Sequence, residues 1–267
     1  MLWRIIIVSD GKIKFEDGEA YEQLMGVWSQ FVGRQFLKWL AADNHQRWLD
    51  VGCGNGAFTE QIIKHCSPSK VHGIDPSGAQ IEYAIKRPGV QSASFQSGDA
   101  SRLPFDANQF DVAAMALVLF FVPDPMQSVK EMMRVVRPNG IVTAYVWDIH
   151  EGGFPLEPIH AEMRARKIKY TLPISSTVSK MENLKNLWVE SGLKSVDTCV
   201  IEVKRTFKSF SYFWNVSQES GTLKNVFKEL DETTKKDLRH ATKLRLKLEG
   251  DEPFTIDACA NAVSGIV

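Results

Sequence analysis

Strand-like and helix-like segments alternate between residues 46 and 148, and this alternation constrains the fold more than any other feature of the sequence. The strand-like segments are RWLDVG, KVHGIDPS, ASFQSGDA, the beginning of FDVAAMALVLFF, and GIVTAYVWD. The helix-like segments are AFTEQIIKHC, SGAQIEYAIKR and DPMQSVKEMMRVVR, the last closed by Pro138-Asn139-Gly140. Strands that alternate with helices of about 10–15 residues form right-handed βαβ crossovers, so we predict an α/β protein built on a parallel sheet.

Two more strands and one more helix are predicted towards the C-terminus. SKMENLKNLWVESGL has the pattern of a helix with Gly192 at its C-cap. VDTCVIEVKRTF alternates like a strand, and FTIDACANAVSGIV is the candidate last strand. The chain therefore contains seven predicted strands.

Residues 149–177 and 209–250 interrupt the alternation, and the second segment carries a long polar helix predicted at residues 231–249. Both follow late strands, and ligands of open α/β sheets bind outside the carboxyl ends of the strands. Insertions at that edge are candidates for a lid or a substrate wall. We expect one domain over residues 46–267 with these two insertions.

The N-terminal segment, residues 1–45, is predicted to be helical and to pack on that domain. Within residues 19–41, apolar side chains recur at helical spacing, and most of them are expected in the core. They are Leu24, Trp28, Phe31, Val32, Phe36, Trp39 and Leu40.

Composition narrows the function classes. The chain has 267 residues, of which 44% are hydrophobic and 24% charged, and its 32 basic residues balance its 32 acidic ones. A general nucleic-acid binder usually has a basic excess, which is missing here. The four cysteines show neither CxxC pairing nor zinc-like spacing, so we expect reduced thiols and no metal site. With no secretory or membrane-spanning run in the sequence, the expected location is the cytoplasm.

Gly52, Gly54 and Gly56 follow a predicted strand and precede a predicted helix, a position where backbone can approach a ligand closely. The helix N-terminus adds free N–H donors and partial positive charge. Acidic residues recur near the ends of three predicted strands, at Asp50, Asp75 and Asp99. Such acids on consecutive parallel strands point into one crevice, so the sequence predicts a nucleoside-type site there.

Two ligands fit the glycine pattern. Gly52-x-Gly54-x-x-Ala57 matches the dinucleotide fingerprint, with Asp75 as the ribose acid, and would indicate an NAD enzyme. The same stretch also has the pattern acid-x-Gly-x-Gly-x-Gly, beginning at Asp50. An acid directly before the glycines suits a ligand with a cationic amino-acid end and suits pyrophosphate poorly.

Five motifs in order resemble a known family. LDVGCGNG, GIDPS, GDASRLPF, FDVAAMALVLFFVPDP and RVVRPNGIV are similar to the motifs of class I S-adenosylmethionine-dependent methyltransferases, across residues 48–147. They most resemble the small-molecule branch of the ubiquinone/menaquinone-biosynthesis type (methyltransferase type 11-like), and the N-terminal helices resemble those of some bacterial members. The resemblance implies a Rossmann-like, mostly parallel sheet of order 3-2-1-4-5-7-6 with helices on both faces and a C-terminal lid.

The resemblance also assigns a cofactor, S-adenosyl-L-methionine, to particular residues. It implies that Gly52, Cys53 and Gly54 run along the methionine part, with Asp50 near its amino group and Asp75 on the ribose. The remaining cofactor positions flank these in the family motifs. They are Pro76 and Gln80 near the adenine, Asp99 and the Ala100 N–H on the adenine edge, and Ala116 and Leu117 near the sulfonium.

The sequence offers fewer candidate residues for the methyl-acceptor site than for the cofactor site. Where the family often has histidine after the fourth strand, this chain has Phe120-Phe121, which supplies no base and favours an apolar acceptor wall. His150, after the fifth strand, is the candidate base. Tyr21 and Trp28 in the N-terminal segment are the other candidates for acceptor contact or closure.

His160 and Arg164 are spaced i and i+4 in the first insertion, on a face that could meet an anionic acceptor but more often meets solvent. The fourth strand lacks the [DN]PPY motif of amine-directed nucleic-acid methyltransferases. We therefore expect methyl transfer, by in-line displacement, to a small and partly apolar molecule, in a monomer or homodimer without nucleic-acid or membrane partners. Two alternatives stay open: an NAD(P)-dependent oxidoreductase, and a non-catalytic nucleoside-binding protein of the same fold.

Overall fold

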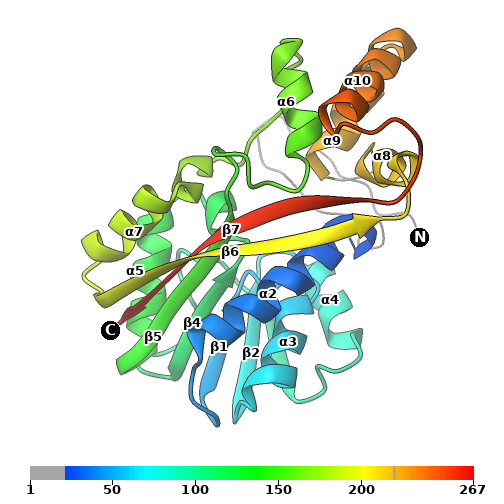
Figure 1. Ribbon diagram of the computed structural model, residues 1–267. Helices are drawn as coiled ribbons and strands as arrows, with labels where there is room; N and C mark the ends of the chain where they lie inside the picture. The colour runs from blue at the N-terminus through cyan, green and yellow to red at the C-terminus, as the bar shows by residue number, and fades with distance from the viewer. Residues whose placement is uncertain (1–21, 219–220) are drawn as a thin grey trace.

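A computed structural model describes residues 22–218 and 221–267 and shows a single seven-stranded sheet (Figure 1). The strands are β1 (Arg47–Val51), β2 (Lys70–Asp75), β3 (Ala93–Ser97), β4 (Phe110–Ala116), β5 (Val136–Trp147), β6 (Lys194–Phe207) and β7 (Phe254–Ile266). Their order is β3-β2-β1-β4-β5-β7-β6, and β7 runs antiparallel to both neighbours. The predicted mostly parallel sheet and its strand order are confirmed.

Helices cover both faces of the sheet. One face carries α2 (Val27–Leu40), α3 (Ala57–Cys66) and α4 (Gly78–Lys86), and the other carries α5 (Pro125–Val135) and α7 (Met181–Glu190) (Figure 1). Side-chain caps begin two of them: Ser77 accepts from the Gln80 N–H, and Asp124 accepts from the Gln127 N–H. The helix predicted before Pro138 ends earlier, at Val135, because Val136 already pairs with Phe110 in the sheet.

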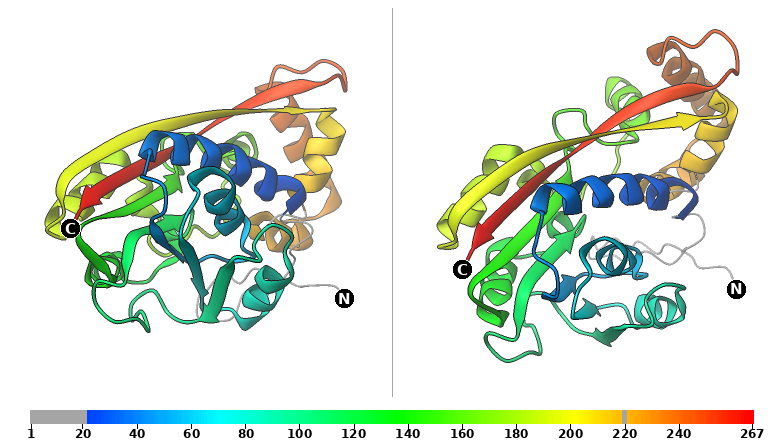
Figure 2. Two further views of the ribbon diagram at one scale, coloured as in Figure 1. Left: turned by 90° about the horizontal axis from the view of Figure 1, so that it is seen from below. Right: turned by 60° about the horizontal axis from the view of Figure 1, so that its bottom comes forward.

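The described N-terminal part begins with a π-helical turn, η1 (Glu22–Gly26), that continues into α2. α2 lies along the sheet face under β6 (Figure 2). Trp28 and Phe36 are fully buried in this contact, and the Phe36 ring lies 4.6 Å from that of Tyr145 on β5. Phe31, expected in the core, is instead 41% exposed.

β6 and β7 continue beyond the carboxyl end of β5 as a two-stranded ribbon. Trp147, the last residue of β5, pairs with Ala260, whereas β6 and β7 stay paired as far as Phe207 and Phe254. Four helices gather at the far end of this ribbon (Figures 1 and 2). They are α6 (Glu157–Ala165), α8 (Phe210–Gln218), α9 (Gly221–Glu229) and α10 (Glu232–Arg245). Both sequence insertions therefore project from the carboxyl edge of the parallel strands.

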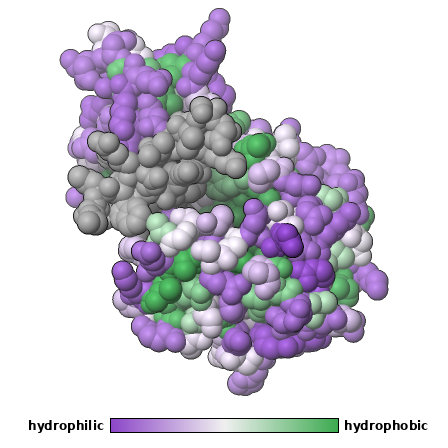
Figure 3. All heavy atoms as spheres, turned by 180° about the vertical axis from the view of Figure 1, so that it is seen from behind, coloured by the Kyte–Doolittle hydropathy of each residue, from purple (hydrophilic) through white to green (hydrophobic). Residues whose placement is uncertain are grey.

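The second insertion holds three helices where one long polar helix was predicted. The helix predicted at 231–249 is α10, which begins at its Asp231 cap and ends at Arg245. Leu238 and Thr242 are buried, and Arg245 forms an ion pair with Glu162 at 2.7 Å, so α10 packs on α6. The outer surface of this projecting part is mostly hydrophilic (Figure 3).

Two short 3-10 turns lie at the same edge. They are η2 (Leu119–Phe121), after β4, and η3 (Ser176–Ser179), after the first insertion. Ser175 connects them: its N–H donates to the Phe120 carbonyl at 3.0 Å and its hydroxyl to the Val122 carbonyl at 2.7 Å. The insertion after β5 is thereby anchored to the segment that follows β4.

Candidate functional site

The glycine loop bends over the carboxyl end of β2. The N–H groups of Gly52 and Cys53 both donate to the Ile74 carbonyl, at 2.7 and 3.0 Å. Gly52, Gly54 and Gly56 all have positive φ, which favours glycine. Hydrogen bonds to the neighbouring strand therefore hold this loop in its bend.

Gly52 and Gly54 have different surroundings. A Cβ atom at Gly52 would lie 2.5 Å from a methyl carbon of Val118, so close packing against the segment after β4 excludes a side chain there. Within residues 22–218 and 221–267, a Cβ atom at Gly54 would meet no protein atom within 4 Å. The space beside Gly54 is open, and a ligand can approach the backbone there.

Asp75 joins the end of β2 to this loop. Its carboxylate accepts from the Gly54 N–H at 3.0 Å and from the Ser77 N–H at 2.9 Å. Burial raises the pKa of Asp75, and these two bonds oppose that shift. A carboxylate oxygen can accept more than one hydrogen bond, so both oxygens of Asp75 can still accept from a ligand hydroxyl.

Asp50 lies deeper than the sequence suggested. The residue is fully buried in β1, and one carboxylate oxygen accepts from the Thr59 hydroxyl at 2.6 Å. Among the described residues the other oxygen has no hydrogen-bond partner. Burial raises the pKa of Asp50 to about 7, opposed by the Thr59 bond and helped by the negative charge of Asp75. A cationic group of a ligand would satisfy both the unpaired oxygen and the buried charge.

Thr59 was not singled out from the sequence, although it has a direct part in this arrangement. It lies in the first turn of α3, nine residues after Asp50, where its hydroxyl meets the strand-terminal carboxylate. The available signal was a hydroxyl residue in the first turn of the helix that follows a glycine loop. Val118, which packs on Gly52, carried no sequence signal because the contact joins segments far apart in the chain.

The candidates for the adenine side lie along the same edge. The Gly98 N–H donates to the Asp75 carbonyl at 3.1 Å, which places the end of β3 beside the end of β2. Asp99 is exposed and accepts from the backbone and hydroxyl of Ser101, at 2.8 and 2.7 Å. Pro76 is exposed, and Gln80 and Ala100 are half-buried. The tertiary structure thus brings all these positions to the edge that the glycine loop occupies.

Ala116 and Leu117 lie at the carboxyl end of β4, on the other side of β1 from β2. Ala116 is the last residue of β4, and the Leu117 N–H donates to the Tyr145 carbonyl at 2.9 Å. Leu117 has a φ of 60°, in the left-handed region that non-glycine residues seldom adopt. Backbone strain of this kind persists only where neighbouring structure enforces it, and here the adjoining Val118 packs against Gly52.

The candidates for the acceptor side are dispersed. Trp28 is fully buried, with its ring 6.4 Å from that of Trp147 and 6.3 Å from that of Phe207. Phe120 is buried beside Phe121, and His150 is exposed in the turn after β5. Tyr21 lies outside the described residues.

The expectation that His160 lies on a solvated or anion-facing helix face is wrong, whereas Arg164 is half exposed as a solvated face requires. The His160 ring is 4% exposed and stacks between Phe154, 5.2 Å away, and Tyr170, 4.4 Å away. Burial, assisted by the Arg164 charge, lowers the pKa of His160 to about 3. Arg164 binds Glu157 and the Tyr170 hydroxyl, so its charge is already neutralised. His160 is buried because two aromatic rings of the same insertion, Phe154 and Tyr170, cover its ring.

Comparison with known proteins places this site in a family. Residues 49–144 match the family model described as a methyltransferase domain. Residues 49–144 therefore form a methyltransferase domain. The match includes the strands and loops that carry Asp50, the three glycines, Asp75 and Asp99, so the family resemblance inferred from the motifs is confirmed.

Curated relatives and solved structures agree with the domain assignment. A demethylmenaquinone methyltransferase of Staphylococcus aureus is 32% identical over 146 residues, covering 54% of this chain and 58% of the relative. This chain thus matches little more than half the length of that relative.

Solved methyltransferases share the fold at low identity. An S-adenosylmethionine-dependent methyltransferase of Aquifex aeolicus has a TM-score of 0.54 at 19% identity, covering 71% of this chain and 94% of that one. Phosphoethanolamine N-methyltransferase 2 of Haemonchus contortus, solved with S-adenosyl-L-methionine, has a TM-score of 0.57 at 18% identity, covering 92% of this chain and 56% of that one. At such identities the likeness shows the methyltransferase fold.

Proposed function

We propose that this chain transfers a methyl group from S-adenosyl-L-methionine to a small, partly apolar acceptor. The observation that carries the proposal is the unpaired, fully buried oxygen of Asp50 directly before a glycine loop with open space at Gly54. A cationic amino-acid end next to a nucleoside suits this arrangement. The methyltransferase domain at residues 49–144 and the strand order support the same ligand.

The residues present fit each part of the cofactor. We assign the carboxylate of Asp50 to a cationic amine and the open space at Gly54 to the chain that bears it; the burial of Asp50 and the space at Gly54 support this. Asp75 is already oriented by the Gly54 and Ser77 N–H groups, so its remaining lone pairs can accept from ribose hydroxyls. Asp99 and Ala100, at the next strand end, are proposed for the adenine edge. Cys53, Pro76, Gln80, Ala116 and Leu117 complete the proposed contacts.

When bound, S-adenosyl-L-methionine supplies an activated methyl group on a sulfonium, with a neutral thioether as leaving group. The protein's task is to align the acceptor atom and keep water out. We assign the floor to Ala116 and Leu117, and the apolar wall to Phe120 and its neighbours. The insertion helices at the carboxyl edge form the proposed lid, because both insertions project there and are joined by the Arg245–Glu162 ion pair.

The acceptor class follows from the apolar segment after β4 and from the named relative. A demethylated menaquinone precursor, the acceptor in that relative's name, is the acceptor to test first. No base is assigned beyond His150, which is exposed in the turn after β5. Among residues 22–218 and 221–267, no helix has the length and apolar character needed to cross a membrane.

The first experiment is calorimetric titration of the purified protein with S-adenosylmethionine, S-adenosylhomocysteine and NADH in parallel. We expect the two adenosyl-sulfur ligands to bind and NADH not to bind. Binding of NADH alone would replace this proposal with the oxidoreductase alternative. Transfer of a radiolabelled methyl group to a panel of quinols and phenols then separates an enzyme from a non-catalytic nucleoside binder.

A further inference from the structure

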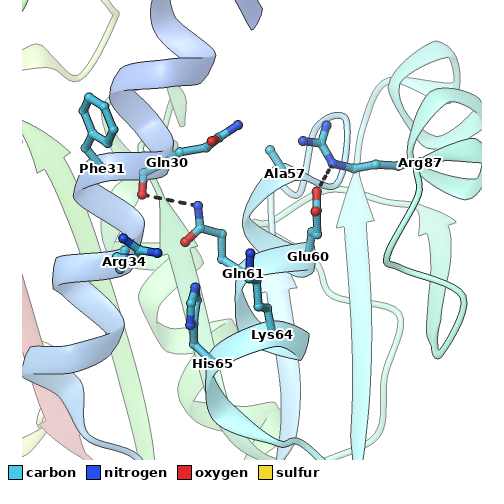
Figure 4. Close-up of a pocket in the computed structure, with 9 residues that line it drawn as sticks. All are labelled: Gln30, Phe31, Arg34, Ala57, Glu60, Gln61, Lys64, His65 and Arg87. Carbon is cyan, nitrogen blue, oxygen red and sulfur yellow. Dashed lines mark hydrogen bonds and ion pairs between the residues drawn. The ribbon is translucent and has the colours of Figure 1, made fainter. Parts of the chain in front are cut away.

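A groove lies between α2 and α3, on the outer side of the molecule (Figure 4). Its volume is about 280 Å³. The side-chain amide of Gln61 bridges the two helices by donating to the Gln30 carbonyl at 3.3 Å. Gly52, Gly54 and Asp75 do not line the groove, which begins at Ala57, the first residue of α3.

Cationic side chains from three elements line this groove. Arg34 comes from α2, Lys64 and His65 from the last turn of α3, and Arg87 from the residue that caps α4. Arg34 and His65 lie close together on one side, while Arg87 lies on the opposite side (Figure 4). Helix C-termini favour cations, which accounts for Lys64 and His65 but not for Arg34 in the middle of α2.

The charge of the groove is not balanced. Among the described residues that line it, Glu60 is the single carboxylate, and its partner is Arg87 at 2.7 Å. Within residues 22–218 and 221–267, neither Arg34 nor Lys64 has a carboxylate in ion-pair range. Burial lowers the pKa of His65, and the charges of Arg34 and Lys64 lower it further, which means that the field at this ring is positive.

We infer that this groove binds the phosphate group of an organic phosphate monoester through Arg34 and Lys64. A guanidinium and an ammonium that line one groove suit a phosphate dianion. Phe31, 41% exposed at the rim, offers an apolar contact for the organic part. The proposed cofactor carries no phosphate, so this is a second site with a different ligand class.

The test follows the His65 ring by NMR, with inorganic phosphate as the probe. Phosphate bound beside His65 raises the pKa of that imidazole, whereas sodium chloride at equal ionic strength does not reproduce the rise. Arg34→Gln and Lys64→Gln should each weaken phosphate binding by about fivefold or more. Lys38→Gln, an exposed lysine on the same helix but outside the groove, is the matched control and should leave the affinity unchanged.

Two further arms identify the source of the phosphate. Glycerol phosphate tests a soluble monoester, and phosphatidylcholine vesicles with and without phosphatidic acid test a lipid headgroup. Arg34-dependent binding in either arm supports the site. The inference is overturned if phosphate raises the pKa of His65 no more than chloride does. It is also overturned if that rise persists in both Arg34→Gln and Lys64→Gln.

The same variants separate this inference from the proposed methyl transfer. Calorimetric binding of S-adenosylhomocysteine should be unchanged in Arg34→Gln and Lys64→Gln, because neither side chain lies at the glycine loop. If the wild-type protein does not bind S-adenosylhomocysteine, the proposed methyl transfer is wrong, but the inference of a phosphate site is unaffected.

Discussion

One oxygen of the Asp75 carboxylate accepts a hydrogen bond from the Gly54 backbone N–H, 3.0 Å away. The bond ties the end of β2 to the glycine loop, so the proposed ribose acceptor and the loop beside the methionine part form one unit. Neither group can move without disturbing the other. A ligand that contacts both therefore meets a site already in place, which lowers the entropic cost of binding.

Replacement of Asp75 by alanine removes both the loop contact and the proposed ribose acceptor. A hydrogen bond to a charged group contributes about 1.5–3 kcal/mol, so affinity for S-adenosylhomocysteine should fall by about 10- to 150-fold. Calorimetry measures the change. Asp106→Ala serves as control, because this exposed carboxylate lies away from the glycine loop and accepts a hydrogen bond from the Gln109 side chain. If Asp75→Ala binds S-adenosylhomocysteine as tightly as the wild type, Asp75 does not contact the ligand.

The buried Asp50 makes stability depend on pH. Its folded-state pKa is raised from 3.8 to about 7 by burial, so the folded state keeps a proton that the unfolded state releases. Stability of the ligand-free protein should therefore fall as pH rises from about 4 to 7, by an amount on the order of 4 kcal/mol. Asp50→Asn should flatten this slope and raise the urea midpoint at pH 8. If stability depends on pH equally in Asp50→Asn and the wild type, Asp50 is not the group that titrates.

The same residue should control ligand affinity in the opposite direction. Ionised Asp50 can pair with a cationic amine, so affinity for S-adenosylhomocysteine should increase as pH rises through 7. Asp50→Asn should bind more weakly and lose that increase, although it is the more stable protein at pH 8. A variant that gained stability and kept full affinity would show that Asp50 does not face the ligand.

Side chains added at Gly52 and at Gly54 should have different effects: the first on stability and the second on cofactor binding. Gly52→Ala places a Cβ atom 2.5 Å from a Val118 methyl carbon, so it should lower the thermal midpoint, and Val118→Ala should partly restore it. Gly54→Val projects into open space, so most of the fold should survive while cofactor binding is lost. The positive φ of Gly54 adds about 1–2 kcal/mol of strain. Normal binding by folded Gly54→Val would show that the loop does not touch the ligand.

His160 should make the protein sensitive to acid. Burial lowers its pKa from 6.5 to about 3, so the unfolded state binds a proton that the folded state refuses. Stability is therefore undiminished above pH 6.5 and should fall as pH drops from 6.5 towards 3. His160→Phe keeps the stack between Phe154 and Tyr170 and should remove this loss in urea titrations. Equal acid sensitivity in both proteins would place the titrating group elsewhere.

Local pattern alone predicted the elements around the site. The helix predicted from AFTEQIIKHC is α3, and the predicted strands at Arg47 and Lys70 are β1 and β2, because burial of one face imposes a period that is visible in a single sequence. The same pattern of strand, loop and helix identified the three glycines and Asp75 as candidate site residues. The strand order needed the family resemblance, since pairing of distant strands leaves no local trace.

Only the tertiary structure decided which side chains are buried, paired or exposed. The sequence by itself determined that a carboxylate, three glycines and a strand-terminal Asp75 meet at one edge of a parallel sheet. It did not determine that Asp50 is fully buried with an unpaired oxygen, or that His160 stacks between Phe154 and Tyr170. It also did not show that Arg34 and His65 share a groove. Each of these depends on contacts between segments far apart in the chain, and the local hydrophobic period does not encode such contacts.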